Sequence, residues 1–403
     1  MTAQLIELML QPSTRTQESP IEPSPAWREL QHSAPVHRVR LPDGHYAWIL
    51  TDYQLMRKVL ADHKRFSARY ELWHLPFPFV EEGGTLPPAM VGDPSGIDPP
   101  HHTRIRQAVT GLFTVRRMRQ LTERIQKMTN EHLDAMEKLT PPVDLVKVFA
   151  EAIPSLTICE LLAVPEDRRE EFLNQARTVM SWDVSLEERG AAHNAVHDYL
   201  HSLVVEKRAD PTDDMISDLA ATDLTLDEIA GFCAFLLGAG MDTTSNMIAT
   251  GMFVLFNHPE QLTELRNDPT LIDDAVEELL RYLSVADMAF RTALEDVEVG
   301  GETIKAGETL VFSLAVGNRD PKKYPDPDRL DLRRKPSGHL AFSHGIHQCL
   351  GQQLARVEMR VTIPALLERF PSLRLAASAE DIPMRTRENI YGVWNLPVTW
   401  GEE

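Results

Sequence analysis

One short segment near the C-terminus combines a single cysteine with histidines and glycines in a pattern that could bind a metal. Residues 342–351 read Phe-Ser-His-Gly-Ile-His-Gln-Cys-Leu-Gly, and Cys349 stands just ahead of a stretch, QQLARVE, that favours a helix. The amino end of a helix offers unpaired N–H groups and a positive dipole end. Both stabilise a thiolate, the form of cysteine that binds metals. Gly345 and Gly351 would let the backbone approach a flat macrocycle closely.

Taken alone, Cys349 has two other interpretations. It could be a buried structural cysteine, or it could join His344 and His347 in a zinc site. A structural zinc site usually has four ligands with paired spacing, and this segment contains only one thiol. The choice between these alternatives depends on the other patterns in the chain.

A second pattern, Ala-Gly-Met-Asp-Thr-Thr at residues 239–244, lies in the middle of a long apolar stretch. Gly238 and Gly240 weaken a helix, and the hydroxyls of Thr243 and Thr244 compete for its carbonyl groups. We therefore expect a locally opened helix with a groove for a diatomic ligand and water. The alternative is a polar break in a core helix.

Two further groups of charged residues have spacing that could serve a cofactor. Glu278 and Arg281 stand three residues apart in AVEELLRY and would pair on one face of a helix. Residues 98–106, Asp-Pro-Pro-His-His-Thr-Arg-Ile-Arg, gather basic side chains that could bind carboxylates. Each group alone is more typical of ordinary solvated charges.

Together, these four patterns resemble the motifs of the cytochrome P450 family. The cysteine segment matches the haem-binding signature Phe-x-x-Gly-x-His/Arg-x-Cys-x-Gly at every defined position. The Glu-x-x-Arg pair and the Ala-Gly-x-Asp-Thr-Thr stretch resemble two further motifs. Residues 98–106 resemble the stretch that faces the haem propionates, although His101 stands where glutamate is commoner. The motifs follow the family's order, and weaker resemblance covers nearly the whole chain.

The resemblance implies a cytochrome P450 fold, mainly α with small β-sheets, haem b as the cofactor, and a role for each matching residue. Cys349 would be the axial iron ligand, whose thiolate favours O–O cleavage. Asp242 and Thr243 would be the catalytic acid–alcohol pair that passes protons into the oxygen-binding site. Glu278 and Arg281 would support the core on the haem side. Other residues expected at the haem are His102, Arg106, Ala239, Gly240, Arg291, Phe342, Gly345, His347 and Gly351.

By the same comparison, mostly apolar side chains would line a pocket for a hydrophobic substrate. Core packing accounts equally well for any one of them. The candidates are Trp73, Leu75, Phe77, Phe79, Val80, Met180, Trp182, Ala239, Val285, Ala286, Met288, Ala289, Ile390, Tyr391 and Val393.

The resemblance also implies an activity, that of a haem-thiolate monooxygenase. Such an enzyme inserts one atom of O₂ into a hydrophobic small molecule by hydroxylation or epoxidation, here in natural-product tailoring. A peroxygenase or isomerase on the same haem is an alternative, although such enzymes usually lack the acid–alcohol pair. A non-catalytic haem-binding protein is another.

Electrons would come from NAD(P)H through ferredoxin reductase and ferredoxin, since the chain shows no fused flavin or iron–sulfur domain. A local basic patch on an acidic protein can steer an acidic ferredoxin. The candidate docking patch comprises Arg104, Arg116, Arg117, Arg119, Arg356 and Arg360.

Charge and composition exclude several other classes of protein. The formal net charge of −19 over 403 residues does not favour nucleic acid or an anionic membrane as a partner. Three cysteines are too few for a disulfide framework and fit a reducing cytosol. The first residues, MTAQLIELML, lack the features of a signal peptide. We therefore expect a cytoplasmic protein, and we also expect a monomer.

The elements that must position these motifs are mostly helical. We expect a loose lead-in over residues 1–25 and a single domain over residues 26–403, with a β-hairpin near its start. A capping-box pattern at Thr225 and Glu228 starts a helix of about 30 residues, ~45 Å long. Short strands follow Arg291, and the last helix begins near the cysteine.

Overall fold

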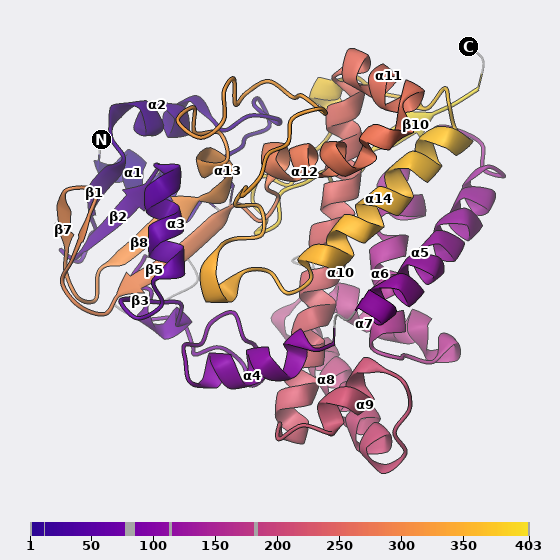
Figure 1. Ribbon diagram of the computed structural model, residues 1–403, viewed down its shortest axis with the longest axis horizontal. Coiled ribbons are helices and arrows are strands. Elements are labelled where there is room, and N and C mark those ends of the chain that lie inside the picture. Colours follow the sequence, from indigo (N-terminus) through magenta and orange to yellow (C-terminus); the bar gives the residue numbers. More distant parts are fainter. Residues whose placement is uncertain (1, 12, 77–84, 113–114, 181–183, 402–403) are drawn as a thin grey trace.

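The structure, a computed structural model, describes residues 2–11, 13–76, 85–112, 115–180 and 184–401. Most strands gather at one end of the molecule and most of the long helices at the other (Figure 1). The helices are α1 (Thr2–Leu10), α2 (Pro25–Ser33), α3 (Tyr53–Ala61), α4 (His101–Thr110), α5 (Val115–Met136), α6 (Ala152–Leu161), α7 (Arg169–Met180), α8 (Leu186–Ala209), α9 (Met215–Ala220), α10 (Leu226–Phe256), α11 (Pro259–Asn267), α12 (Ile272–Leu283), α13 (Leu314–Gly317) and α14 (Gln352–Arg369).

The largest sheet has five strands in the order β1-β2-β8-β5-β3. The expected hairpin forms its edge, and β2 pairs in parallel with β8 while the other pairs are antiparallel. A three-stranded sheet has the order β4-β10-β9, and β6 pairs with β7. The strands are β1 (Val36–Arg40), β2 (Tyr46–Leu50), β3 (Phe66–Ser67), β4 (Val143–Asp144), β5 (Met288–Ala293), β6 (Val297–Val299), β7 (Glu302–Ile304), β8 (Thr309–Ser313), β9 (Arg374–Leu375) and β10 (Pro397–Thr399). The architecture is mainly α with small β-sheets, which confirms the sequence-based expectation.

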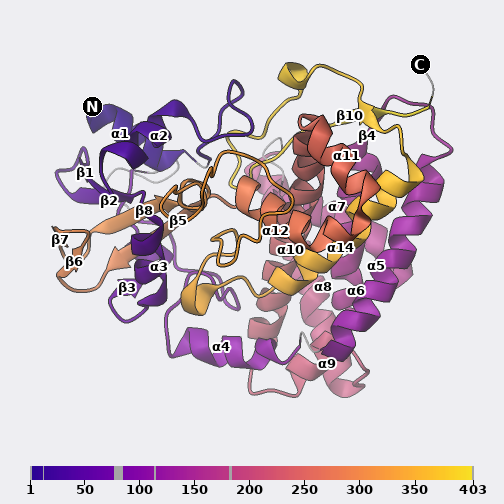
Figure 2. The same ribbon diagram turned by 45° about the horizontal axis from the view of Figure 1, so that its top comes forward.

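Helix α10 crosses the helical part of the molecule and packs against α6, α8, α12 and α14 (Figures 1 and 2). Its start is the expected capping box, in which Thr225 accepts from the Glu228 amide and the Glu228 side chain accepts from the Thr225 amide. The helix is apolar on most sides because helices surround it. It is continuous over its whole length, so the expectation of a locally opened helix is wrong.

The expectation of a loose lead-in over residues 1–25 is also wrong. The described part of this segment begins with α1, and the chain packs against the core. Arg15 is only 2% exposed, and its guanidinium donates to the carbonyls of Tyr282 and Leu283 at the end of α12. A cation there satisfies carbonyl groups that a helix end leaves unpaired. Within the described residues, no helix is long and apolar enough to span a membrane.

Candidate active site

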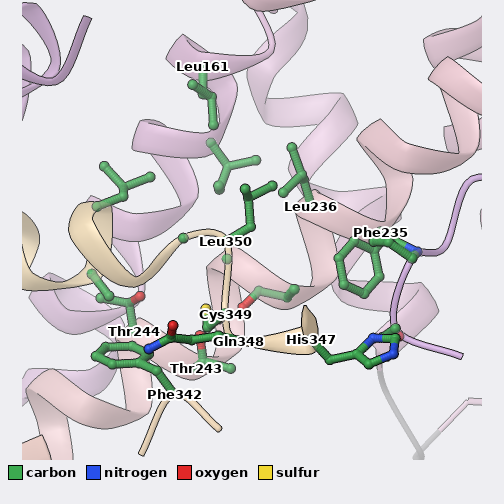
Figure 3. Close-up of a pocket in the computed structure, with 18 of the residues that line it drawn as sticks. Leu161, Phe235, Leu236, Thr243, Thr244, Phe342, His347, Gln348, Cys349 and Leu350 are labelled. Atoms are coloured by element: carbon green, nitrogen blue, oxygen red, sulfur yellow. Dashed lines mark hydrogen bonds between the residues drawn. The ribbon is translucent and has the colours of Figure 1, made fainter. Parts of the chain in front are cut away.

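A cavity lies between α10 and the segment that leads into α14. Its walls come from α4, α6, α10 and α14 and from the loop before α14. Figure 3 shows Thr243, Phe342, His347 and Cys349 among the side chains that surround it. The lining includes His102, Arg106, Ile158, Leu161, Phe235, Leu236, Ala239, Gly240, Thr243, Thr244, Phe342, His347, Cys349, Gly351 and Glu358. The fold thus brings the cysteine segment and the threonine segment to one place.

Cys349 follows a short 3₁₀ turn, Gly345–His347, and comes just before α14. The exposed surface of its side chain faces the inner cavity, and the side chain itself lies deep within the protein. Burial raises the pKa of the Cys349 thiol, while hydrogen bonds from the amides of Gly351 and Gln352 oppose that shift. The amides at the start of α14 therefore point at the sulfur, as the sequence suggested. A positive ion in the cavity would tip the balance to the thiolate.

The two glycines of the cysteine segment have different roles. Gly345 has a φ of +80°, and a Cβ atom there would lie 2.2 Å from the carbonyl oxygen of Leu60 at the end of α3. A glycine is therefore needed at position 345 for this turn and for the close contact with α3. It is not needed there for approach to a macrocycle. Gly351 lines the cavity, and a Cβ there would meet open space.

Helix α10 forms the wall that faces the cysteine. Ala239, Gly240, Thr243 and Thr244 line the cavity. The Thr243 hydroxyl donates to the Ala239 carbonyl oxygen over 2.7 Å. This bond leaves the oxygen lone pairs of the hydroxyl free to accept from a donor in the cavity.

Asp242 points away from the cavity and is held by an ion pair that sequence reasoning did not predict. Arg385 contacts both of its carboxylate oxygens, over 2.6 Å and 3.1 Å. Asn246 donates to the same carboxylate over 2.9 Å. Arg385 belongs to the strand-like pair of segments around Met384 and Val393, which lies beside α10. The predicted acid–alcohol pair is thus adjacent in sequence, but the two side chains face different surroundings.

Four basic side chains gather beside the cavity, as the resemblance implied. The rings of His102 and His347 lie 4.3 Å apart, and Arg106 donates to the Gln348 carbonyl oxygen over 2.8 Å. Burial lowers the pKa of His347 to about 3 and that of Arg291 to about 10. Mutual repulsion adds to the effect at both histidines.

These basic groups are short of anionic partners. Asp98 is near Arg291, but its oxygens accept hydrogen bonds from Ser67 and the Ala68 amide. The Nε2 atom of His347 is buried without a hydrogen-bond partner among the described residues. A buried guanidinium cation requires an anion or a strong acceptor, and a buried imidazole N–H requires an acceptor. The cluster therefore suits a ligand that carries carboxylates.

Glu358 of α14 is a cavity residue that sequence reasoning missed. It is 2% exposed, and its carboxyl group is hydrogen-bonded to the hydroxyls of Thr157 and Thr244. Burial raises its pKa to about 8, so it carries a proton at neutral pH. A signal was present in the sequence, because Glu358 falls between Leu354 and Thr362 on the buried face of an otherwise recognisable helix.

The predicted pair of Glu278 and Arg281 lies in α12, completely buried, with contacts of 2.7 and 2.8 Å. Arg281 also donates to the carbonyl oxygens of Asn318 and Pro327, both over 2.9 Å. Glu278 accepts from the Asp331 amide as well. The pair thus ties α12 to the irregular segment that precedes the cysteine.

Most substrate-pocket candidates lie elsewhere than in the cavity. Ala239 lines it, whereas Trp73 stacks on Phe290 with ring centroids 4.7 Å apart. Val285 and Val393 are buried in the core with Tyr391, Ile390 packs against that core, and Met288 and Ala289 lie in β5. Leu75 is in another core cluster. Phe77, Phe79, Val80 and Trp182 lie outside the described residues.

A second cavity of about 610 Å³ lies beside the first, between α7, α8 and the first half of α10. Phe235 lines both cavities. The walls are mainly apolar and include the candidate Met180, with imidazoles of α8 among the polar groups. The other lining residues include Met90, Val91, Asp93, Val179, His193, His197, Asp227 and Leu237. A hydrophobic molecule of moderate size fits such a space.

The residues of the first cavity fit an iron porphyrin. One cysteine sulfur receives amide hydrogen bonds and lies opposite an α-helical wall. The basic groups at one side, which are short of anionic partners, match the two propionates of haem. A zinc site with His344 and His347 is not supported, because His344 contacts Arg57 of α3 and His347 stacks on His102.

This combination of fold and site defines the haem-thiolate oxidoreductases. Residues 26–389 match the Cytochrome P450 family, and the chain belongs to that family. It is therefore a cytochrome P450 monooxygenase with a haem-thiolate cofactor.

The chain is similar to several cytochromes P450 of Streptomyces species. The chain is 46% identical to cytochrome P450 105C1 of a Streptomyces species over 94% of this chain and 95% of that protein. It is 42% identical to pentalenic acid synthase of Streptomyces avermitilis, covering 96% of each. The solved structure of CYP105P1 in complex with filipin I has a TM-score of 0.88 and 39% identity, covering 96% of this chain and 98% of that one.

Proposed function

We propose that this enzyme hydroxylates or epoxidises a hydrophobic small molecule in natural-product tailoring, with haem b at Cys349 and electrons from NAD(P)H through ferredoxin reductase and ferredoxin. The observation that carries the proposal is the shared cavity, in which the Thr243 hydroxyl and Cys349 lie on facing walls. The names of two relatives, pentalenic acid synthase and the filipin I complex, support a natural-product substrate.

When bound, the haem activates O₂ for insertion into the substrate, and the protein supplies binding, orientation and protons. His102, Arg106, Arg291 and His347 would hold its propionates. Phe342 and Ala239 would pack against its faces from the two walls. The amides of Gly351 and Gln352 lower the negative charge density on the sulfur by hydrogen bonding.

Thr243 would position water for proton delivery. Its hydroxyl proton is engaged by Ala239, so its oxygen can accept from a water in the cavity and orient that water's second proton. Asp242 would supply protons from the outer side of α10. For that step the contact with Arg385 must loosen, because Arg385 occupies both carboxylate oxygens and water must reach one of them.

The substrate would enter through the second cavity. Its apolar walls desolvate a hydrophobic molecule, and Phe235 at the junction would contact whatever reaches the first cavity. Val91 and Met90, both largely exposed, border the cavity from the loop before α4. The cavity's size, rather than a specific polar group, would select among substrates.

The electron donor would approach near α5 and α14, which pack side by side (Figures 1 and 2). This surface is less positive than the sequence alone suggested, since most of its arginines have acidic partners. The pairs are Arg104 with Asp223 and Glu228, Arg116 with Asp213, Arg117 with Asp218, Arg356 with Glu277, and Arg360 with Asp273.

Turnover with isotopically labelled O₂ tests the proposal. A panel of terpenoids and macrolides is first screened for a spin-state change, and the ligands that bind are incubated with NADPH, ferredoxin reductase and ferredoxin. We expect one labelled oxygen atom in the product. Product that contains no label, or product formed only with added peroxide, would instead indicate an isomerase or a peroxygenase. No turnover of any bound ligand would favour a non-catalytic role.

A further inference from the structure

Two histidines and one aspartate come together at the tip of the β1–β2 hairpin, on the side of the molecule away from the long helices (Figure 1). Asp43 and His45 belong to the hairpin turn, and His74 follows the short 3₁₀ turn Tyr70–Leu72. The backbone of His74 is anchored to the sheet, because its amide donates to the Thr309 hydroxyl over 2.9 Å. Residues about 30 positions apart thus meet at a fixed point.

Their ligand atoms converge. The Nε2 atom of His74 lies 2.5 Å from one carboxylate oxygen of Asp43, and Nδ1 of His45 lies 3.3 Å from the other. One donor atom from each residue lies within 4.8 Å of the other two. Zinc binds nitrogen and oxygen ligands at about 2.0–2.2 Å, which places tetrahedral ligand atoms about 3.3–3.6 Å apart. Small side-chain rotations would therefore bring all three onto one ion.

The charges also suit a divalent cation. The Asp43 carboxylate accepts a hydrogen bond from the His45 amide over 3.0 Å and contacts the His74 ring over 2.5 Å, so it brings a negative charge to the centre of the cluster. Neutral imidazole and carboxylate are ligands of zinc and of neighbouring first-row cations. The side chains of Asp43 and His74 are about one-third exposed, and that of His45 two-thirds, so an ion can enter and keep water as a fourth ligand.

We propose that Asp43, His45 and His74 form a surface site for Zn²⁺ or a similar first-row divalent cation. An ion there would tie the hairpin tip to the segment that leads from β3 toward the loop bordering the substrate cavity. Its binding would restrain that segment without touching the haem site. The bare hydrogen-bonded cluster, with no affinity for metal, is the competing account.

The test is a titration of tag-free holoenzyme with zinc sulfate, followed by calorimetry, in the wild type and in three variants. His74→Gln and His45→Gln each remove one ligand from the cluster. His197→Gln is the matched control, because His193 and His197 stand four apart on α8 and could bind zinc themselves. The absorption spectrum of the haem in each variant shows that the protein remains folded.

We expect the wild type to bind one zinc ion at the cluster in the micromolar range or tighter. Each cluster variant should weaken that binding by about tenfold or more, and the control should retain it. Equal affinity in His74→Gln and the wild type, or no micromolar site in the wild type, would overturn the proposal. Diffraction data collected at the zinc absorption edge give a second answer, since a peak must lie between the three side chains.

Discussion

The Thr243 hydroxyl already donates one hydrogen bond, to Ala239, so its proton is committed to α10. Its remaining capacity is to accept, which suits a role in orienting water. A residue with this role affects the fate of the reaction more than its start.

We expect Thr243→Ala to bind substrate normally and to consume NAD(P)H and O₂ at a similar rate. Product per NAD(P)H should fall about tenfold or more, with hydrogen peroxide taking its place, because the second proton is no longer guided to the right atom. Both species are measured in one reaction. If coupling stays complete, the relay runs through another group, and Thr244→Ala is the next variant.

Glu358 makes stability depend on pH. Its pKa is raised to about 8 in the folded protein from an ordinary 4.5, so the unfolded chain releases this proton first. Its contribution to stability is complete below the unfolded pKa and is lost as pH rises toward 8. Glu358→Gln should therefore be more stable than the wild type at about pH 8 and similar to it at about pH 5.

Urea unfolding of both holoproteins across that pH range gives the comparison. Identical pH profiles would mean that Glu358 is ionised in the folded state.

The motifs predicted Cys349 and Thr243 as cavity residues, since each motif is local in sequence. They could not predict Glu358 with Thr157, or Arg385 with Asp242, because those contacts join distant segments.

At the scale of elements, the segment from Met384 to Val393 is fastened to α10 through one ion pair. Gly392 approaches Asn246 so closely that a Cβ atom there would lie 1.8 Å from its side-chain oxygen. Arg385 stacks on Trp394 and pairs with Asp242. The side chains of Asp242 and Arg385 are both mostly buried, which makes the loss of one partner costly.

Arg385→Ala should lower the free energy of unfolding by about 1–3 kcal/mol, because it leaves the Asp242 carboxylate without its cation. The double variant with Asp242→Asn should lose less than the sum of the two single changes. A double-mutant cycle by urea unfolding measures this coupling. Additive losses would show that the ion pair does not stabilise the contact.

Helix α5 carries Arg116 and Arg117, two arginines of the surface where we propose that ferredoxin docks. Arg116 is 61% exposed and pairs with an equally exposed aspartate, a contact of little energetic value that a partner could replace. Reversal of Arg116 and Arg117 to glutamate should slow reduction by ferredoxin and weaken its dependence on salt. Stopped-flow reduction at low and high salt is the measurement, with chemical reduction by dithionite as the control. Unchanged rates at low salt would remove this surface from the docking site.

Some elements were predictable from local chemistry alone. The capping box fixed the start of α10, and the turn between Leu41 and Tyr46 gave the hairpin. The continuity of α10 was not predictable, since the glycines and threonines of its middle are destabilising in isolation. Contacts with α6, α8, α12 and α14 outweigh that local preference.

The whole molecule explains the error at the N-terminus. Proline, serine and threonine suggested a loose segment, but Arg15 finds the end of α12 and the ring of Tyr391, 5.0 Å away. Both partners lie more than 250 positions from Arg15 in the sequence, and the composition of the N-terminal segment does not indicate either contact. At this scale, the approach of α10 to the cysteine segment was predicted from the family resemblance and not from periodicity.

The central claim, a haem bound through Cys349, is tested most directly by the CO-difference spectrum of the reduced protein. The wild type should show the red-shifted band of thiolate ligation. Cys349→Ser should lose it, while Cys159→Ser and Cys233→Ser should keep it, because both of those thiols are buried in the core away from the cavity. A Cys349→Ser protein that retains the red-shifted band would contradict the assignment.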